Sequence, residues 1–438
     1  MRGVVVVVNR RSIALEARRE SAKALSLPRM ANTAKRALSH VGGRVHIEAG
    51  ADGDRELLEF ALNVSAEDPY LRSHVHGFHA YPARLHPVTA QRLVKGLSRP
   101  GERVLDPFCG SGTVLVEALL EGRSPSGLDA NPLAVMLTTY KLQWMDQDKL
   151  GSLIAAARAV AESADARRMR RAGPSRRYPV SQARQFDPHV LLELDGLRTG
   201  IEEVKAAQTR KGLLLVLSSI ANKVSRQESD TSNRQSQRRW ASGFVIQFFV
   251  KKAEELAKRQ AQFGARLAER ERETSTVKLG DARHLPFENA AFAAVITSPP
   301  YPGVYDYVEH HRLRLQWLGL DVNYLAKHEI GARRQAHDES ATYNEQMRGC
   351  LGEMSRIIKR TGTIALVVAD TVVNDVPWYA DREIESIASR VGLKVVAAAA
   401  QPRPHFHRAT AKAFGRRPRS ERVLLLRPAE TARGRGAK

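Results

Sequence analysis

The stretch Val104-Leu-Asp-Pro-Phe-Cys-Gly-Ser-Gly-Thr113 decides the fold that we expect for this chain. A short apolar run opens into two glycines, and a helical pattern follows from Thr113 onward. Because glycine has no Cβ, the backbone at Gly110 and Gly112 can approach a ligand closely. The helix that follows offers free N–H groups at its start. The stretch therefore predicts a strand, a ligand-binding loop and a helix.

A second loop has the same design. Val295-Ile-Thr-Ser-Pro-Pro-Tyr301 is an apolar strand that runs straight into two prolines. Proline fixes φ at about −65° and has no backbone donor, so Ser298 and Pro299 can direct bare carbonyl oxygens into a cavity. Tyr301 offers a flat aromatic face beside them. Such a loop suits a planar base that carries an amino group.

Together, the two loops resemble those of the S-adenosylmethionine-dependent methyltransferases that modify exocyclic amino groups of nucleic-acid bases. In that family the first loop, here residues 106–113, cradles the methionine part of the cofactor, and the second, here residues 298–301, holds the target amine. The resemblance extends over roughly residues 74–134 and 276–428. It implies S-adenosyl-L-methionine as cofactor, catalytic roles for Ser298, Pro299, Pro300 and Tyr301, and cofactor contacts from Asp106, Phe108, Gly110, Gly112 and Thr113.

Three further segments match the cofactor site of this family. The second strand ends at Asp129, where an acid can accept hydrogen bonds from both ribose hydroxyls; an ordinary helix cap before Asn131-Pro132 is the alternative. Asp281 follows the third strand, as the family's adenine-contacting loop does, although Asp after Gly is also a plain turn signal. The resemblance also assigns cofactor contacts along the methionine end to Phe78, Tyr81 and Pro82.

Strand-like runs alternate with helical patterns along most of the chain. The runs lie at residues 103–108, 125–130, 276–280, 292–297, 362–369, 393–400 and 422–426. This alternation predicts an α/β fold with a seven-stranded, mostly parallel, doubly wound sheet. The resemblance implies that this fold is of the Rossmann-like class I methyltransferase type. The resemblance adds that the last two runs form an antiparallel hairpin.

Residues 135–275 interrupt the alternation. Helical patterns occur at 150–172, 188–207, 213–224 and 239–273, and only 213–217 is ambiguous between helix and strand. We expect a split catalytic domain, residues 46–134 and 276–428, and a helical insertion, residues 135–275, that recognises the target. Residues 1–45 and the tail 429–438 are basic and lack apolar periodicity, so we expect both to be mobile.

The positive charge lies outside the blocks that carry the motifs. The chain has a formal net charge of +22, whereas residues 1–45, 135–275 and 402–438 together carry +27. Phosphate contacts supply much of the sequence-independent affinity for nucleic acids, so this distribution predicts a polyanion-binding surface. Candidate contacts are Arg226, Arg238 and Arg239. The alternative is that these arginines lie on ordinary solvated faces.

Cysteine usage and hydropathy exclude several other classes. The two cysteines, Cys109 and Cys350, give neither a disulfide framework nor the spacing of a metal site, as expected in a reducing cytoplasm. We expect Cys109 to line the cofactor pocket and Cys350 to lie in a core. No apolar run approaches the ~18 residues of a membrane span. We therefore expect a soluble cytoplasmic protein without a bound metal.

The expected chemistry is methylation of a base amine. Such an amine is a poor nucleophile, and hydrogen bonds to Ser298 and Pro299 would draw it towards sp³ geometry while Tyr301 stacks on the base. On duplex DNA the base must be flipped out. Asp306, His310 and His311 could act as bases, but we favour a helix start there.

The choice of substrate depends on one residue. The serine before Pro-Pro-Tyr favours cytosine N4 in DNA as the target over adenine N6. The alternatives are an adenine-N6 DNA methyltransferase, a tRNA guanosine-N2 methyltransferase acting on RNA, and an inactive nucleic-acid-binding subunit. The sequence identifies neither a recognition sequence nor a restriction partner.

Overall fold

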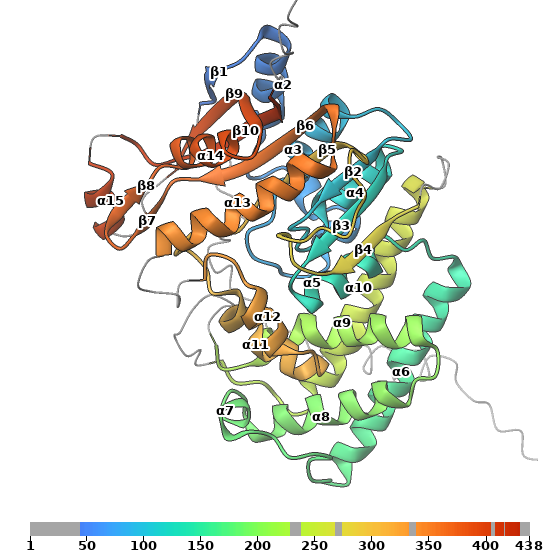
Figure 1. The fold of residues 1–438 in the computed structure, drawn as a ribbon. Coiled ribbons are helices and arrows are strands. Elements are labelled where there is room, and N and C mark those ends of the chain that lie inside the picture. The colour runs from blue at the N-terminus through green and yellow to red at the C-terminus, as the bar shows by residue number, and fades with distance from the viewer. Residues whose placement is uncertain are drawn as a thin grey trace, which may run out of the picture. The chain divides into compact units, whose positions relative to one another are not determined.

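The computed structural model describes residues 44–227, 238–267, 274–332, 339–403, 408–415 and 417–429. Most of the two basic ends, and residues 228–232 of the polar stretch in the insertion, lie outside these ranges. The main sheet has the strand order β1-β9-β10-β6-β5-β2-β3-β4 (Figure 1). Its strands are β1 (His46–Ala49), β2 (Arg103–Asp106), β3 (Ser124–Asp129), β4 (Thr276–Leu279), β5 (Phe292–Thr297), β6 (Ile358–Ala369), β9 (Leu393–Pro402) and β10 (Ser420–Pro428).

The pairing of these strands confirms the predicted α/β fold. Strands β6, β5, β2, β3 and β4 pair in parallel, whereas β10 pairs antiparallel with both β6 and β9. The expected hairpin of the last two strands is therefore present. The sequence predicted seven strands, and β1 is an eighth that pairs antiparallel with β9, His46 opposite Ala400. The prediction missed it because its four residues, His-Ile-Glu-Ala, form no apolar run.

A small second sheet was also missed. Strands β7 (Thr371–Val373) and β8 (Val376–Trp378) form an antiparallel hairpin. Asn374 and Asp375 between them have φ of +49° and +61°, the left-handed conformation that a two-residue hairpin turn of type I′ requires. Asn and Asp adopt this conformation more readily than other residues with a side chain, so the Asn-Asp pair was the available signal.

Both faces of the sheet are covered by helices. Leu105 and Val295 pack on the face covered by α13 (Glu339–Ile357) and α14 (Ala380–Ser389). Val104 and Ala294 pack on the opposite face, which carries α2 (Asp52–Leu62), α3 (Pro87–Leu97) and α4 (Thr113–Leu120). Burial on both faces explains why these strands read as continuous apolar runs rather than as an alternating pattern.

Strands β2 and β5 bring the two predicted loops together. They are parallel neighbours, with Val104 paired to Ala294 and Leu105 paired to Val295. The glycine loop follows β2 and the Ser-Pro-Pro-Tyr loop follows β5, so both leave from carboxyl ends of adjacent strands. The chain continues from β2 to β3 and β4 on one side, and from β5 to β6 on the other. Ligands of doubly wound sheets bind where the strand order reverses in this way.

Helices fill the described part of the predicted insertion. They are α6 (Gln147–Met169), α7 (Val180–Ala183), α8 (Pro188–Glu203), α9 (Ala207–Val224) and α10 (Phe244–Leu267). The run 213–217, ambiguous in the sequence, is helical and lies inside α9. The remaining helices are η1 (Pro69–Arg72), η2 (His74–Gly77), α5 (Pro132–Lys141), α11 (Tyr307–Leu318), α12 (Val322–His328) and α15 (Arg408–Ala413). Within the described ranges, every helix is too short or too polar to cross a membrane.

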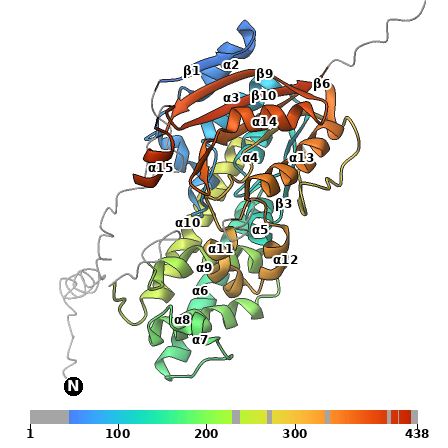
Figure 2. The same cartoon turned by 60° about the vertical axis from the view of Figure 1, so that its left-hand side comes forward.

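Two helices from after the Ser-Pro-Pro-Tyr loop pack with the insertion. The ring of Trp317 in α11 lies 5.7 Å from that of Phe186, and Arg198 of α8 donates a hydrogen bond to the Gln316 carbonyl at 3.2 Å. Leu318 and Leu325 belong to the same apolar core as α6, α8, α9 and α10. We call α6–α12 the helical layer, and Figures 1 and 2 both show its members side by side.

Candidate active site

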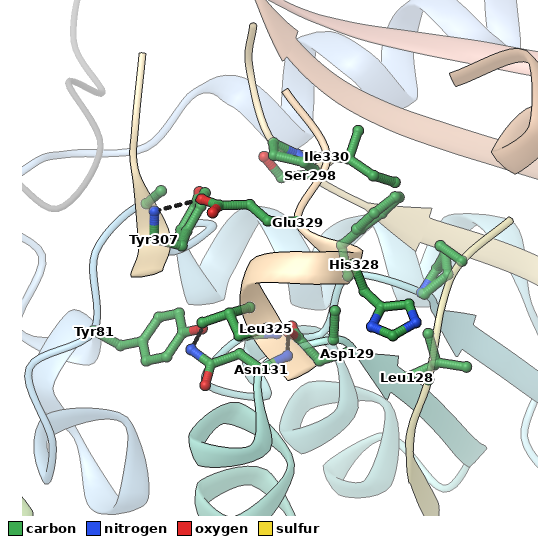
Figure 3. A pocket seen from close by; sticks show the side chains of 18 of the residues that line it. Tyr81, Leu128, Asp129, Asn131, Ser298, Tyr307, Leu325, His328, Glu329 and Ile330 are labelled. Carbon is green, nitrogen blue, oxygen red and sulfur yellow. Dashed lines mark hydrogen bonds between the residues drawn. The ribbon is translucent and has the colours of Figure 1, made fainter. Parts of the chain in front are cut away.

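A cavity with an empty volume of about 660 Å³ lies between the two loops and α12 (Figure 3). A smaller cavity of about 340 Å³ shares Tyr81, Phe108, Gly110 and Ser298 with it. The larger cavity is lined by residues 81–83, 107, 108, 110, 128–131, 280, 282, 298, 300, 307, 325 and 328–330.

The glycine loop has the shape that the sequence predicted. Gly110 and Gly112 have φ of +49° and +79°, which residues with a side chain rarely adopt. A Cβ on Gly112 would lie 2.6 Å from Cγ2 of Thr138, and one on Gly110 would lie 3.2 Å from the ring of Tyr81. Thr138 Oγ1 also donates to the Gly110 carbonyl at 2.9 Å. Both positions therefore need glycine for conformation and for space.

Asp129 connects the end of β3 to the glycine loop. Its carboxylate accepts hydrogen bonds from the backbone N–H of Gly110 at 2.7 Å and of Asn131 at 2.8 Å. Burial raises the pKa of Asp129 to about 6, although these two hydrogen bonds oppose the rise. Asn131 is the cap of α5, because its side chain accepts from the N–H of Leu133 at 3.0 Å. Asp129 lines the cavity and is not itself the helix cap.

Asp106 joins the two loops directly. Thr297 Oγ1 donates to the Asp106 carboxylate at 2.6 Å, and the N–H of Phe108 donates to the same oxygen at 3.1 Å. Burial raises the pKa of Asp106 to about 7, against the effect of both hydrogen bonds. Since Thr297 immediately precedes Ser298, a change in one loop is passed on to the other.

Only some of the four residues predicted to be catalytic in the Ser-Pro-Pro-Tyr loop line the cavity. Ser298 and Pro300 line the larger cavity, whereas Pro299 and Tyr301 line neither cavity. The Tyr301 hydroxyl lies 3.2 Å from a Glu421 carboxylate oxygen and 3.4 Å from Ser298 Oγ. The stacking role predicted for Tyr301 is therefore not what this conformation displays. Glu421 on β10, the partner of the Tyr301 hydroxyl, lies 120 residues later in the chain.

A positively charged subsite adjoins the start of α4. Ser111 Oγ and Arg84 Nε are buried without a hydrogen-bond partner among the described residues. Lys141 donates to the Ser111 carbonyl at 2.9 Å, and burial lowers the pKa of Arg84 only to about 10, so Arg84 stays charged at neutral pH. Burial lowers the pKa of Lys141 well below its usual value, so Arg84 is the cation that, together with the helix N-terminus, favours an anionic ligand here. Arg84, Ser111 and Thr113 line the smaller cavity.

Two predicted cofactor residues lie outside the cavities. Arg283 donates to both Asp281 oxygens, at 2.6 to 3.0 Å, so the Asp281 carboxylate is occupied by its own neighbour. Gly280 and Ala282 line the cavity instead. Phe78 is only 2% exposed and packs in the core of the helical layer, where the Lys252 ammonium lies 5.6 Å from its ring centroid. Tyr81 and Pro82 line the cavity.

The arginines predicted to contact nucleic acid fall into two groups. Arg226 donates to the Asp187 carboxylate at 2.8 Å, so its guanidinium already has an intramolecular partner. Arg238 and Arg239 are exposed just before α10. All three arginines are exposed, and contact with phosphate stays a prediction for each of them.

Sequence reasoning missed the wall of the cavity that the helical layer supplies. Tyr307, His328 and Glu329 line the cavity, and the N–H of Tyr307 donates to the buried Glu329 carboxylate at 2.6 Å. The helix start favoured at Asp306 is confirmed, because its carboxylate caps α11 by accepting from the N–H of Glu309 at 3.0 Å. The dense aromatic and histidine residues at 305–311 were the only local signal.

The two cysteines lie where the sequence predicted. Cys109 is buried and lines the smaller cavity. Cys350 is buried in the core beneath α13.

Three buried side chains have the chemistry of metal ligands. Donor atoms of His74, His76 and Glu117 all lie within 4.8 Å of one another. Tyr70 adjoins them, and Arg266 donates to its hydroxyl at 2.7 Å. Burial first, and then nearby Arg and Lys charges, lower the pKa of both histidines, and burial raises the pKa of Glu117 to about 8. Because these cations disfavour a bound metal ion, we interpret the group as a hydrogen-bonded link between α4 and α10.

One protein-family model matches part of the chain. Residues 51–139 match the N6/N4 methyltransferase family model, described as DNA methylase. The match covers the glycine loop and Asp129, and it confirms the resemblance to amino-methyltransferases that the two loops indicated.

Two curated proteins are similar to parts of this chain. The type II methyltransferase M.MvaI of Kocuria varians is 26% identical over 277 residues, which are 57% of this chain and 58% of that protein. The type II methyltransferase M.MjaII of Methanocaldococcus jannaschii is 35% identical over 81 residues, 18% of this chain and 15% of that protein. The chain thus spans little more than half of the one relative and a smaller part of the other.

Solved structures that resemble this chain include methyltransferases of low sequence identity. The rRNA methyltransferase AviRa of Streptomyces viridochromogenes has a TM-score of 0.34 and 12% identity, with 83% of this chain and 94% of that chain covered. An S-adenosylmethionine-dependent methyltransferase of Methanosarcina mazei has a TM-score of 0.31 and 9% identity, with 77% and 98% covered.

Proposed function

We propose that this protein transfers a methyl group from S-adenosylmethionine to the exocyclic amine of a DNA base, with cytosine N4 as the target. The observation that carries this proposal is a shared cavity. The glycine loop and Asp129 line the same space as Ser298, and the bond between Asp106 and Thr297 ties the two loops together.

The cavity residues fit the three parts of the cofactor. Arg84, the buried Ser111 hydroxyl and the start of α4 suit its carboxylate. The Asp129 carboxylate suits the ribose hydroxyls, and the strand end at Gly280 suits the adenine. When bound, the cofactor supplies an electrophilic methyl group. The methyl end then lies between the glycine loop and Ser298.

The protein's own contribution is to hold the amine. Ser298 Oγ and the Pro299 carbonyl accept hydrogen bonds from the amine and localise its lone pair for in-line attack on the methyl carbon. Tyr343 donates to the Pro300 carbonyl at 2.9 Å, which fixes the loop. The new N–C bond forms as the S–C bond breaks, and the amine's proton passes to solvent.

Duplex DNA is the proposed partner. The net charge of +22 favours a polyanion, and exposed Arg238 and Arg239 lie on the helical layer. The Ser298 end of the cavity cannot reach a base inside a duplex, so the target base must be flipped out, at a cost of a few kcal/mol. Ser298, rather than the Asp or Asn common in adenine enzymes, is the residue that favours cytosine.

The test is mass spectrometry of nucleosides from cells that lack other DNA methylation and express either the wild type or Ser298→Ala. We expect N4-methylcytosine in DNA with the wild type only. N6-methyladenine would overturn the choice of base. Methylated tRNA beside unmodified DNA would overturn the substrate class. Unmodified nucleic acids from a protein that still binds the cofactor and DNA would indicate a binding subunit.

A further inference from the structure

The adenine end of the cavity is completed by α12. Asp129 ends β3 and Gly280 follows the neighbouring β4, so an adenine whose ribose is held by Asp129 lies beside Gly280 and Ala282. The side chains that cover this end from outside the sheet are Leu325 and His328. Figure 3 shows the His328 ring on the side of the cavity where Leu128 and Asp129 lie.

The hydrogen bond of His328 defines what its ring can offer. Its Nδ1 lies 2.8 Å from the Tyr324 carbonyl. A carbonyl only accepts, so Nδ1 carries the hydrogen, and in the neutral ring Nε2 is an acceptor. Within the described ranges Nε2 has no hydrogen-bond partner, and the ring of Tyr324 lies 4.2 Å away and orients the imidazole. His328 thus presents one fixed acceptor.

The carboxylate that the sequence analysis assigned to the adenine amino group already has hydrogen-bond donors of its own. Asp281 was predicted to face the adenine amino group, but Arg283 occupies both of its oxygens. Asp129 is engaged with two backbone N–H groups and faces the ribose position. His328 therefore has the chemistry that the predicted Asp281 contact would have supplied.

We propose that His328 accepts a hydrogen bond from the 6-amino group of the cofactor's adenine. The inference depends on the proposed cofactor and assigns a specificity residue to it. A purine with a 6-oxo group places an oxygen against the Nε2 lone pair, which is repulsive, so the acceptor discriminates between the two bases. The helical layer, and not only the sheet, then selects the cofactor.

Calorimetry with two product analogues tests this directly. S-adenosylhomocysteine carries the 6-amino group, and S-inosylhomocysteine carries a 6-oxo group in its place. We expect the wild type to bind the adenine compound about tenfold more tightly or better, the ratio that one unpaired buried group imposes. His328→Phe keeps a flat ring without an acceptor and should reduce the preference below about threefold.

Two further variants complete the design. His328→Gln restores an acceptor oxygen and should regain part of the preference. His46→Phe, an exposed histidine on β1, should change neither affinity. If His328→Phe binds neither compound, the ratio for His328→Gln decides, because a preference retained there supports the contact and a preference lost there overturns it.

The outcomes separate this inference from the proposed function. A wild type that binds both compounds equally, or a His328→Phe that keeps the full preference, overturns the role of His328 and leaves the cofactor assignment intact. A wild type that binds neither compound contradicts the cofactor itself. Thermal unfolding of each variant shows whether a loss of binding is a loss of folding.

Discussion

The cavity has two walls that are built in different ways. The loop wall consists of residues 81–83, 107, 108, 110 and 128–131, and the helix wall consists of Tyr307, Leu325 and residues 328–330. In the loop wall, glycine conformation and capping within short segments dictate the shape. In the helix wall, Glu329 holds Tyr307 across 22 residues, and His311 stacks on Tyr81 of the opposite wall at 4.8 Å. Both walls thus contribute side chains to the cavity, although only the loop wall carries a sequence motif.

Replacing Ser298, which lines the cavity beside both walls, tests how the target amine is held. Ser298→Ala removes an acceptor for the target amine, so we expect turnover to fall about 100-fold, as small misplacements of a reacting group do. Cofactor affinity should change less than about twofold, because the partner of this hydroxyl is the base. Single-turnover kinetics and calorimetry measure the two quantities. The exposed Ser152→Ala on α6 is the matched control, and equal losses of affinity and turnover would place Ser298 with the cofactor.

Replacing Asp129 breaks the loop wall. Asp129→Ala should weaken cofactor binding by roughly 1 to 3 kcal/mol, the cost of losing charge-assisted hydrogen bonds to the ribose. The measurement is calorimetry, with the exposed Asp148→Ala on α6 as the control. Unchanged affinity in Asp129→Ala would remove this acid from the site.

The charge of Asp129 gives the loop wall a pH dependence. Burial raises its pKa to about 6, so below pH 6 the carboxyl is protonated and can no longer accept from both hydroxyls. Cofactor affinity should therefore fall as the pH drops through 6, by up to about tenfold per unit. The difference between the wild type and Asp129→Asn isolates this carboxyl from Asp106, whose pKa is raised to about 7. Equal pH profiles for the two proteins would contradict the assignment.

The salt dependence of DNA binding tests the outer surface of the helical layer. Replacing Arg238 and Arg239 by Ala should flatten the slope of log affinity against log salt by about one unit for each lost phosphate contact. Arg226→Ala is the matched comparison, because that arginine is paired with Asp187 and should leave the slope nearly unchanged. A slope that stays unchanged when Arg238 and Arg239 are replaced would return these two arginines to the solvated-face interpretation.

The smallest effect is expected at Asp281. Its carboxylate is held by Arg283, so Asp281→Asn should change cofactor affinity by less than about threefold. His328→Phe should lower the affinity for the adenine compound more than Asp281→Asn does. The reverse order, measured in the same titration, would restore the sequence-based assignment of adenine recognition to Asp281.

Much of the fold and of the loop wall could be predicted from the sequence. Seven strands, the glycine loop and the positions of Asp129 and Ser298 at strand ends follow from local patterns whose physical cause lies within a few residues. The hairpin followed from the family resemblance. Gly112 illustrates this, because its φ of +79° is a property of one turn.

The remainder depends on contacts between distant segments. The orientation of Tyr301 depends on Glu421, which is 120 residues away. The pairing of Asp281 with Arg283 is local but competes with a ligand contact, and the sequence does not decide between the two. The helix wall depends on how α11 and α12 pack against α8 and α9, and β1 is too short and mixed to show a period.

The most direct test of the central claim is methyl transfer by the purified protein. S-adenosylmethionine with a deuterated methyl group is incubated with the wild type or Ser298→Ala and with genomic DNA from a host without methylation, which offers every recognition sequence. The DNA is then digested and its nucleosides are analysed by mass spectrometry. We predict deuterated N4-methylcytosine with the wild type and at least a tenfold lower yield with Ser298→Ala. Deuterium absent from every DNA base, with cofactor binding intact, would contradict the account.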